Sequence, residues 1–165
     1  MTGLVLGVDP GTATTGYGLA CEEQGRLKCI AYGVIQTPAG AAVHVRLQIL
    51  YGELSAVVAK YQPVSGAVEK LFFHRNAAAA LAVGQGRGVA LLALADCKVG
   101  VGEYTPREVK QAVTGYGAAT KSQIQLAVQW MLELQELPRP DDAADALAVA
   151  ICHIHSARRN ALLAA

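Results

Sequence analysis

Residues 7–18 have the sequence Gly7-Val8-Asp9-Pro10-Gly11-Thr12-Ala13-Thr14-Thr15-Gly16-Tyr17-Gly18, and they continue the apolar run that starts at Leu4. The run predicts a buried strand over residues 3–9, and the Pro-Gly pair predicts a sharp turn over residues 11–16. Aspartate is among the residues least often buried unless it is paired or bound to a metal. A strand that carries one carboxylate to its tip, at Asp9, therefore indicates a site rather than a core.

Further carboxylates occur in similar settings. Glu69 ends a second short apolar run, residues 64–68, and Asp142 and Asp145 lie one helical turn apart. Taken singly, Asp9 is explained as a turn residue, Asp142 as a helix N-terminal charge and Asp145 as a salt-bridge partner. Taken together, four carboxylates at strand ends and a helix start predict a site for a hard divalent cation, magnesium or manganese, because such ions prefer oxygen ligands.

The rest of the chain reads as an α/β protein with one domain over residues 1–165. Besides the strand at 3–9, we expect strands at 17–21, 27–37, 64–69 and 99–104, and helices at 42–61, 77–95, from 106, from 120 or 121 to 134, and at 141–158. Three strands joined by short turns predict an antiparallel meander, and the later strands predict parallel pairing, so the sheet is mixed and flanked by helices. Right-handed crossovers bring the first and fourth strand ends side by side, which makes Asp9 and Glu69 neighbours. The i, i+3 spacing of Asp142 and Asp145 puts them on one helix face.

Composition limits the classes of function. The chain has 165 residues, 53% of them hydrophobic, a mean hydropathy of +0.31 and a net charge of +1, so it is not disordered. The four carboxylates above account for four of the 13 acidic residues, leaving nine against 14 basic ones. If metal ions neutralise those four, the remaining surface is mildly basic and suits a polyanion.

The compartment is predicted from cysteines and from the lack of a leader or membrane segment. The four cysteines have no zinc-like spacing, so we expect buried free thiols in a reducing cytoplasm. We see no signal peptide at the N-terminus. The apolar stretch 77–95 is interrupted by Gln85, Arg87 and three glycines, so we expect no membrane span there.

Residues 7–18 resemble the opening motif of the RuvC family of bacterial Holliday-junction resolvases. Other segments similar to that family follow in order: Val68-Glu69-Lys70-Leu71-Phe72 with Asn76, Gly84-Gln85-Gly86-Arg87-Gly88-Val89, Val109-Lys110-Gln111-Ala112-Val113-Thr114-Gly115 with Lys121-Ser122-Gln123, and Asp142-Ala143-Ala144-Asp145-Ala146-Leu147-Ala148. The resemblance covers nearly the whole chain. It implies a ribonuclease H-like fold, a homodimer, and magnesium-dependent endonuclease cutting of two symmetric strands of a four-way DNA junction in recombination and repair. It also implies two Mg²⁺ ions per active site, with Mn²⁺ as a possible substitute, and a branch-migration motor of the RuvA and RuvB type as partner.

The resemblance assigns roles to particular residues. The family's catalytic and metal-binding acidic tetrad falls on Asp9, Glu69, Asp142 and Asp145, and its phosphate-contacting lysines fall on Lys110 and Lys121. Its base-wedging aromatic falls on Phe72, with Phe73 beside it, and Arg75 and Arg87 are further candidates for DNA contacts. Core packing remains the alternative for both phenylalanines. Asp141 precedes the expected pair, so the ligating register is open between Asp141 and Asp142, and we expect Asp141 to be an N-cap or outer-shell residue.

Three other functions are compatible with parts of the sequence. Actin-like ATPases share the Asp-x-Gly-Thr turn but need two such domains. A ribosomal-RNA-processing nuclease of the same superfamily has a similar Asp-Pro-Gly start, and a non-catalytic junction-binding protein is the non-enzyme alternative. Small residues along 77–95 predict the dimer contact, because they allow two backbones to approach closely.

Overall fold

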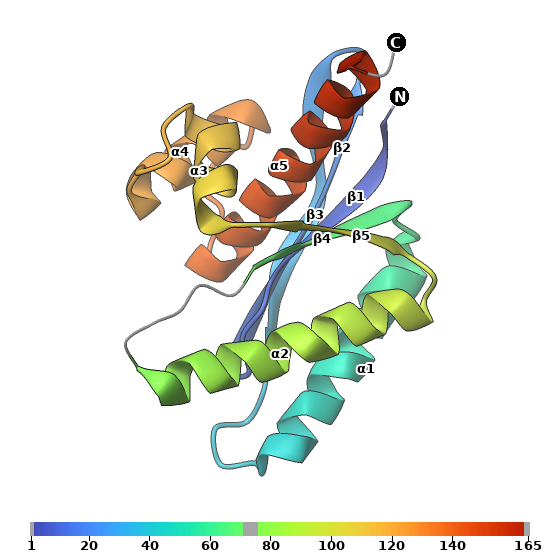
Figure 1. Ribbon diagram of the computed structural model, residues 1–165, viewed down its shortest axis with the longest axis vertical. Coiled ribbons are helices and arrows are strands. Elements are labelled where there is room, and N and C mark those ends of the chain that lie inside the picture. The colour runs from blue at the N-terminus through green and yellow to red at the C-terminus, as the bar shows by residue number, and fades with distance from the viewer. Residues whose placement is uncertain (1, 71–75, 164–165) are drawn as a thin grey trace.

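The computed structural model describes residues 2–70 and 76–163, and within these ranges five strands form one mixed sheet (Figure 1). The strands are β1 (Thr2–Asp9), β2 (Thr14–Glu23), β3 (Arg26–Gln36), β4 (Ser65–Glu69) and β5 (Gly100–Tyr104). Their order in the sheet is β3-β2-β1-β4-β5. The β1–β2 and β2–β3 pairs are antiparallel, whereas β1–β4 and β4–β5 are parallel. The predicted meander with parallel additions is confirmed.

Helices cover both faces of this sheet (Figure 1). The helices are α1 (Val43–Tyr61), α2 (Ala77–Asp96), α3 (Pro106–Thr114), α4 (Lys121–Met131) and α5 (Asp141–Leu163). One core forms where α1 and α2 pack on the sheet, and it includes Leu6, Val8 and Val68. A second core forms on the opposite face under α3, α4 and α5, and it includes Val5 and Ala67. Alternate residues of each central strand therefore belong to different cores, as the pleat of a strand requires.

Side-chain caps fix where several helices begin. Thr105 and Glu108 form a capping box, with Pro106 in the first turn of α3, as the sequence predicts. Thr120 and Gln123 form a second capping box at the start of α4. The side chain of Asn76 accepts hydrogen bonds from two backbone N–H groups at the start of α2. These caps satisfy donors that no helix can satisfy internally.

The structure corrects three expected boundaries. The second strand is longer than 17–21, because Thr14–Gly16 pair with β3 and the hairpin turn narrows to Gln24 and Gly25, both with positive φ, as tight hairpins favour. Helix α4 ends at Met131 rather than 134, and Glu133 just beyond it has the left-handed φ of 52°. Helix α5 begins at Asp141 as expected, so that residue is not the N-cap, but the helix ends at Leu163 rather than 158.

Helix α2 is apolar but belongs to the folded layers. Within residues 2–70 and 76–163 it is the one helix long and apolar enough to cross a membrane by length and composition. It nevertheless packs on α1 and over β4 and β5 (Figure 1). The four cysteines are free, as expected; Cys21 and Cys152 are buried, and Cys29 and Cys97 are partly buried.

Candidate active site

The two central strands carry Asp9 and Glu69 to the same edge of the sheet. Parallel pairing of β1 with β4 sets Val8 opposite Val68, so the next residue on each strand is an acid. Because side chains alternate along a strand, both acids lie on the face that Val5 and Ala67 present to α5. The neighbour relation predicted from crossover handedness is confirmed at the level of strand pairing.

Helix α5 brings its acidic first turns to this edge by unusually close packing. A Cβ at Gly16, which pairs with Asp9 across the β1–β2 ladder, would overlap the carbonyl oxygen of Asp142. A Cβ at Gly7 would overlap the α5 backbone near Ala150. Only glycine allows a helix backbone to rest directly on the strands here, and this contact sets how near Asp142 and Asp145 come to Asp9.

The acids are close enough to perturb one another. Burial, and then the neighbouring charges of Asp145, Glu69 and Asp142, raise the pKa of Asp9 to about 8. Burial and Asp145 raise the pKa of Glu69 to about 7, with Lys110 and Lys121 opposing the rise. Burial also raises the pKa of Asp145, although Lys121 opposes it. Crowded carboxylates that resist ionisation need a cation beside them to be charged together.

A cavity of about 600 Å³ opens over these acids. It is lined by Asp9, Glu69 and Asp145 together with four basic residues: Lys70, Arg107, Lys110 and Lys121. The ammonium of Lys121 lies 3.4 Å from a carboxylate oxygen of Asp145. Lys110 and Lys121 were expected here, whereas Lys70 and Arg107 were missed. Their positions, directly after Glu69 and in the first turn of α3, were the available signal.

The donor chemistry of this edge suits a hard divalent cation, because every candidate ligand is a carboxylate. In the described part of the chain, however, no three acidic, histidine or cysteine side chains converge on one point that could hold an ion. The carboxylates are thus neighbours that repel one another. An ion bound between them would remove that repulsion, and small side-chain movements would have to complete its ligand set.

The remaining expected site residues fall in different places. Asp142 does not line the cavity, but its charge acts on Asp9. Asp141 is exposed and accepts a hydrogen bond of 2.7 Å from Gln125 of α4, and its charge also acts on Asp145 and Lys121. Phe72, Phe73 and Arg75 lie outside the described residues. Arg87 contacts Glu69 and Glu103.

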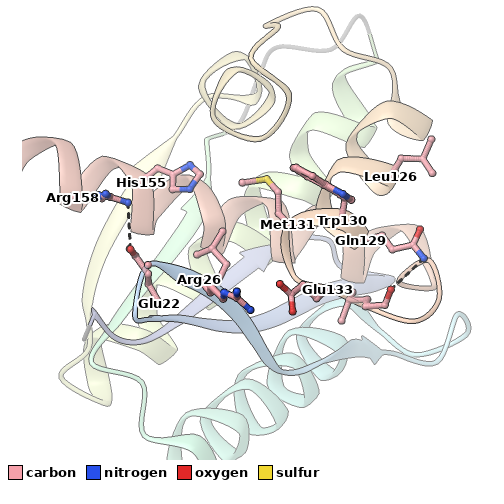
Figure 2. Close-up of a pocket in the computed structure, with 12 residues that line it drawn as sticks. Glu22, Arg26, Leu126, Gln129, Trp130, Met131, Glu133, His155 and Arg158 are labelled. Atoms are coloured by element: carbon pink, nitrogen blue, oxygen red, sulfur yellow. Dashed lines mark hydrogen bonds and ion pairs between the residues drawn. The ribbon is translucent and has the colours of Figure 1, made fainter.

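A larger hollow, of about 950 Å³, lies elsewhere, between the β2–β3 turn, α4 and α5 (Figure 2). Trp130 lines it with 84% of its surface exposed, and Arg158 pairs with Glu22 at one wall. The described residues around this hollow include none of the expected site residues. The larger cavity is therefore not the candidate active site, because the carboxylates line the smaller one.

A family model described as crossover junction endodeoxyribonuclease RuvC matches residues 5–153. The chain belongs to the RuvC family. The family member from Syntrophomonas wolfei is 57% identical over 159 residues, which cover 96% of this chain and 92% of that protein. The one from Heliobacterium modesticaldum is 54% identical, over 93% of this chain and 94% of that protein.

Solved structures agree with this assignment. RuvC of Thermus thermophilus, determined in complex with a Holliday junction substrate, matches with a TM-score of 0.90 at 33% identity over 96% of both chains. The predicted ribonuclease H-like fold is confirmed, and the chain is a member of a family of metal-dependent DNA endonucleases. These relatives support neither the RNA-processing reading nor the non-catalytic one.

Proposed function

We propose that this protein resolves four-way Holliday junctions by hydrolysing one phosphodiester bond in each of two symmetric strands. The observation that carries the proposal is the cluster of mutually repelling carboxylates, Asp9, Glu69 and Asp145, framed by basic residues in one cavity. The Thermus thermophilus relative, at 33% identity, was solved with this kind of substrate. The whole chain, residues 1–165, forms the nuclease domain in this proposal.

In this proposal Asp9, Glu69, Asp142 and Asp145 would hold two Mg²⁺ ions, with Mn²⁺ as a substitute. Bound there, such ions activate water and stabilise the leaving oxygen in phosphoryl transfer. The closeness of Asp142 to Asp9, and the separate hydrogen bond of Asp141 to Gln125, favour Asp142 as the ligand. Asp141 then steadies the start of α5 from outside the ligand set.

The basic residues around the cavity bind and orient the DNA strand. Lys70, Arg107, Lys110 and Lys121 line the same cavity as the carboxylates. They would offset the repulsion between the acids and a phosphate that enters the cavity. Phe72, Phe73 and Arg75 follow Glu69 closely in the sequence, and we assign them to DNA contacts near the crossover.

A homodimer supplies the second cut. Helix α2 exposes a stripe of apolar and small residues at helical spacing: Leu81, Gly88, Leu92 and Ala95. Two copies joined through this stripe would share a two-fold axis with the junction. A Leu92→Glu variant is expected to sediment as a monomer at micromolar concentration; a wild type that is monomeric and still makes paired cuts would contradict the dimer.

A cytoplasmic location and a branch-migration motor of the RuvA and RuvB type complete the proposal.

The test is cleavage of a synthetic mobile four-way junction in Mg²⁺, with wild type and Asp9→Asn compared on the junction, a linear duplex and a structured RNA. We expect paired symmetric nicks in the junction alone, and their loss in Asp9→Asn with junction affinity nearly unchanged. Normal cutting by Asp9→Asn would overturn the catalytic assignment. Cutting of the RNA would support the processing nuclease instead, and binding without cutting in Mg²⁺ or Mn²⁺ would support the architectural role.

A further inference from the structure

Helix α2 contacts the turn that follows β1 and the end of β4, the two strands that carry the central acids. We propose that Arg87 is a positioning residue that holds the end of β4, and with it Glu69, in the place the reaction needs. The inference rests on the proposed nuclease function and adds a residue from α2, a helix that contributes none of the four carboxylates.

Arg87 reaches the strand end directly. Its Nε donates a hydrogen bond of 3.2 Å to the backbone carbonyl oxygen of Glu69. The guanidinium also forms an ion pair with the carboxylate of Glu103 on β5. The Arg87 side chain is 22% exposed and that of Glu103 is 39% exposed, so the guanidinium is mostly shielded from water although its carboxylate partner is more open. Charge-assisted hydrogen bonds are stronger where water is partly excluded.

The carbonyl of Glu69 needs a donor from outside the sheet. Pairing of β1 with β4 ends at Val8 and Val68, one residue before Glu69. On the other side, the N–H of Lys70 still donates to the carbonyl of Tyr104 on β5 at 2.7 Å. Because the C=O and N–H of one trans peptide point in opposite directions, the Glu69 carbonyl points toward the β1 side, beyond the last rung. Arg87 supplies the bond that the ladder no longer provides.

The neighbouring residue makes the second contact. Gly86 is buried, and a Cβ built on it would lie 2.8 Å from the carbonyl carbon and oxygen of Gly11. Gly11 is in the turn that directly follows Asp9 and Pro10. Consecutive residues of α2 therefore support the turn after Asp9 and the peptide after Glu69, which fixes the two strand ends relative to one helix.

Loss of this support should affect the chemical step more than DNA binding. Displacements of about 1 Å at catalytic groups can lower rates about 100-fold. For Arg87→Met, which keeps most of the apolar stem but no donor, we expect kcat for junction cutting to fall roughly 10- to 100-fold. We expect the junction Kd to change less than about two-fold, because no phosphate contact is lost.

Arg87→Lys separates this role from a DNA contact. A lysine keeps the positive charge, and hence any attraction to phosphate, but it has no Nε donor in a planar fork. Positioning predicts that Arg87→Lys is impaired in kcat nearly as much as Arg87→Met. A phosphate contact predicts instead a higher Kd for Arg87→Met, a salt dependence weaker by about one unit of slope, a normal kcat at saturation, and rescue by lysine.

The experiment combines single-turnover cleavage at saturating enzyme with junction binding and Mn²⁺ binding by calorimetry without DNA. Arg158→Met is the matched control, because Arg158 also pairs with a glutamate, Glu22, beside the hollow away from the acids. At a temperature where both variants are folded, we expect Arg87→Met to have a lower kcat and to bind Mn²⁺ several-fold more weakly than the wild type. We expect Arg158→Met to keep the kcat and the Mn²⁺ affinity of the wild type. Wild-type kcat and Mn²⁺ affinity in Arg87→Met would overturn the inference, as would the phosphate-contact pattern. A wild type that binds Mn²⁺ but cuts no junction would instead overturn the proposed function.

Discussion

Replacing Asp9 with asparagine should stabilise the metal-free protein while removing its activity. The pKa of Asp9 is raised from 3.8 to about 8 by burial and by Asp145, Glu69 and Asp142. When folding raises the pKa of a carboxyl, the folded state binds the proton more tightly than the unfolded state. Stability is then lost as pH rises from the unfolded pKa to the folded pKa. Wild-type stability in EDTA should therefore fall as pH rises from about 4 towards 8. Asparagine has a similar shape and no charge, so it removes this loss.

The size of the effect follows from the pKa difference. About four pH units at 1.36 kcal/mol each set a ceiling of roughly 5–6 kcal/mol at pH 8. The actual effect is smaller than this ceiling, because a proton held by Glu69 or Asp145 relieves part of the repulsion on Asp9. We expect Asp9→Asn to gain about 2–3 kcal/mol at pH 8, which corresponds to roughly 5–10 °C in Tm for a chain of this size. At pH 4 the gain should vanish.

Urea unfolding followed by circular dichroism in EDTA, at pH values between 4 and 8.5, measures this directly. Glu53→Gln, on the exposed side of α1, is the control for loss of one carboxylate. Added Mg²⁺ should stabilise the wild type at pH 8 much more than Asp9→Asn, because binding to the folded state alone adds stability. An Asp9→Asn variant no more stable than wild type at pH 8 in EDTA would refute the claim that burial and the neighbouring acids raise the pKa of Asp9.

Three other changes probe separate parts of the site. Lys121→Ala should leave Tm nearly unchanged, because the lysine side chain in its 3.4 Å ion pair with Asp145 is 70% exposed. The slope of log binding constant against log salt concentration for junction binding should become shallower by about one unit. An unchanged slope would contradict the phosphate contact. Gly16→Ala should lower stability by about 2–4 kcal/mol in urea and abolish cutting, because its methyl group overlaps the Asp142 carbonyl; a stable, active variant would show that α5 can move freely. Asp142→Asn should lose cutting and Asp141→Asn should keep most of it, in the same junction assay; the reverse result would shift the ligand register by one residue.

Much of the acidic edge follows from chain order and strand geometry. Asp9 and Glu69 end apolar runs, and right-handed crossovers place those runs side by side, as the β1–β4 pairing shows. The sequence also indicates that Asp142 and Asp145 share a helix face. Their approach to Asp9 could not be predicted, because it depends on how closely α5 packs, and glycines in a strand pattern have several explanations.

The inner contacts were less accessible to sequence reasoning. The sequence suggested a DNA contact for Arg87, and only the placement of α2 shows that it donates to the Glu69 carbonyl. Placing Arg107 at the cavity required knowing which side of α3 faces it, and placing Lys70 there required knowing how the chain leaves β4. The early start of β2 was missed because Thr14 and Gly16 have turn-like composition, whereas pairing with β3 decides their conformation.

The α5 backbone packs directly on β1 and β2, and this close packing limits how the acidic site can be transplanted into another protein. A designer who copies four carboxylates into another sheet would reproduce every functional group and still fail. Any Cβ at the positions of Gly7 and Gly16 would hold α5 away from the strands. Moving the helix outward would separate Asp142 and Asp145 from Asp9, although these acids must act together. Two positions without side chains thus belong among the first to be copied, although a mutational survey of functional groups would never visit them.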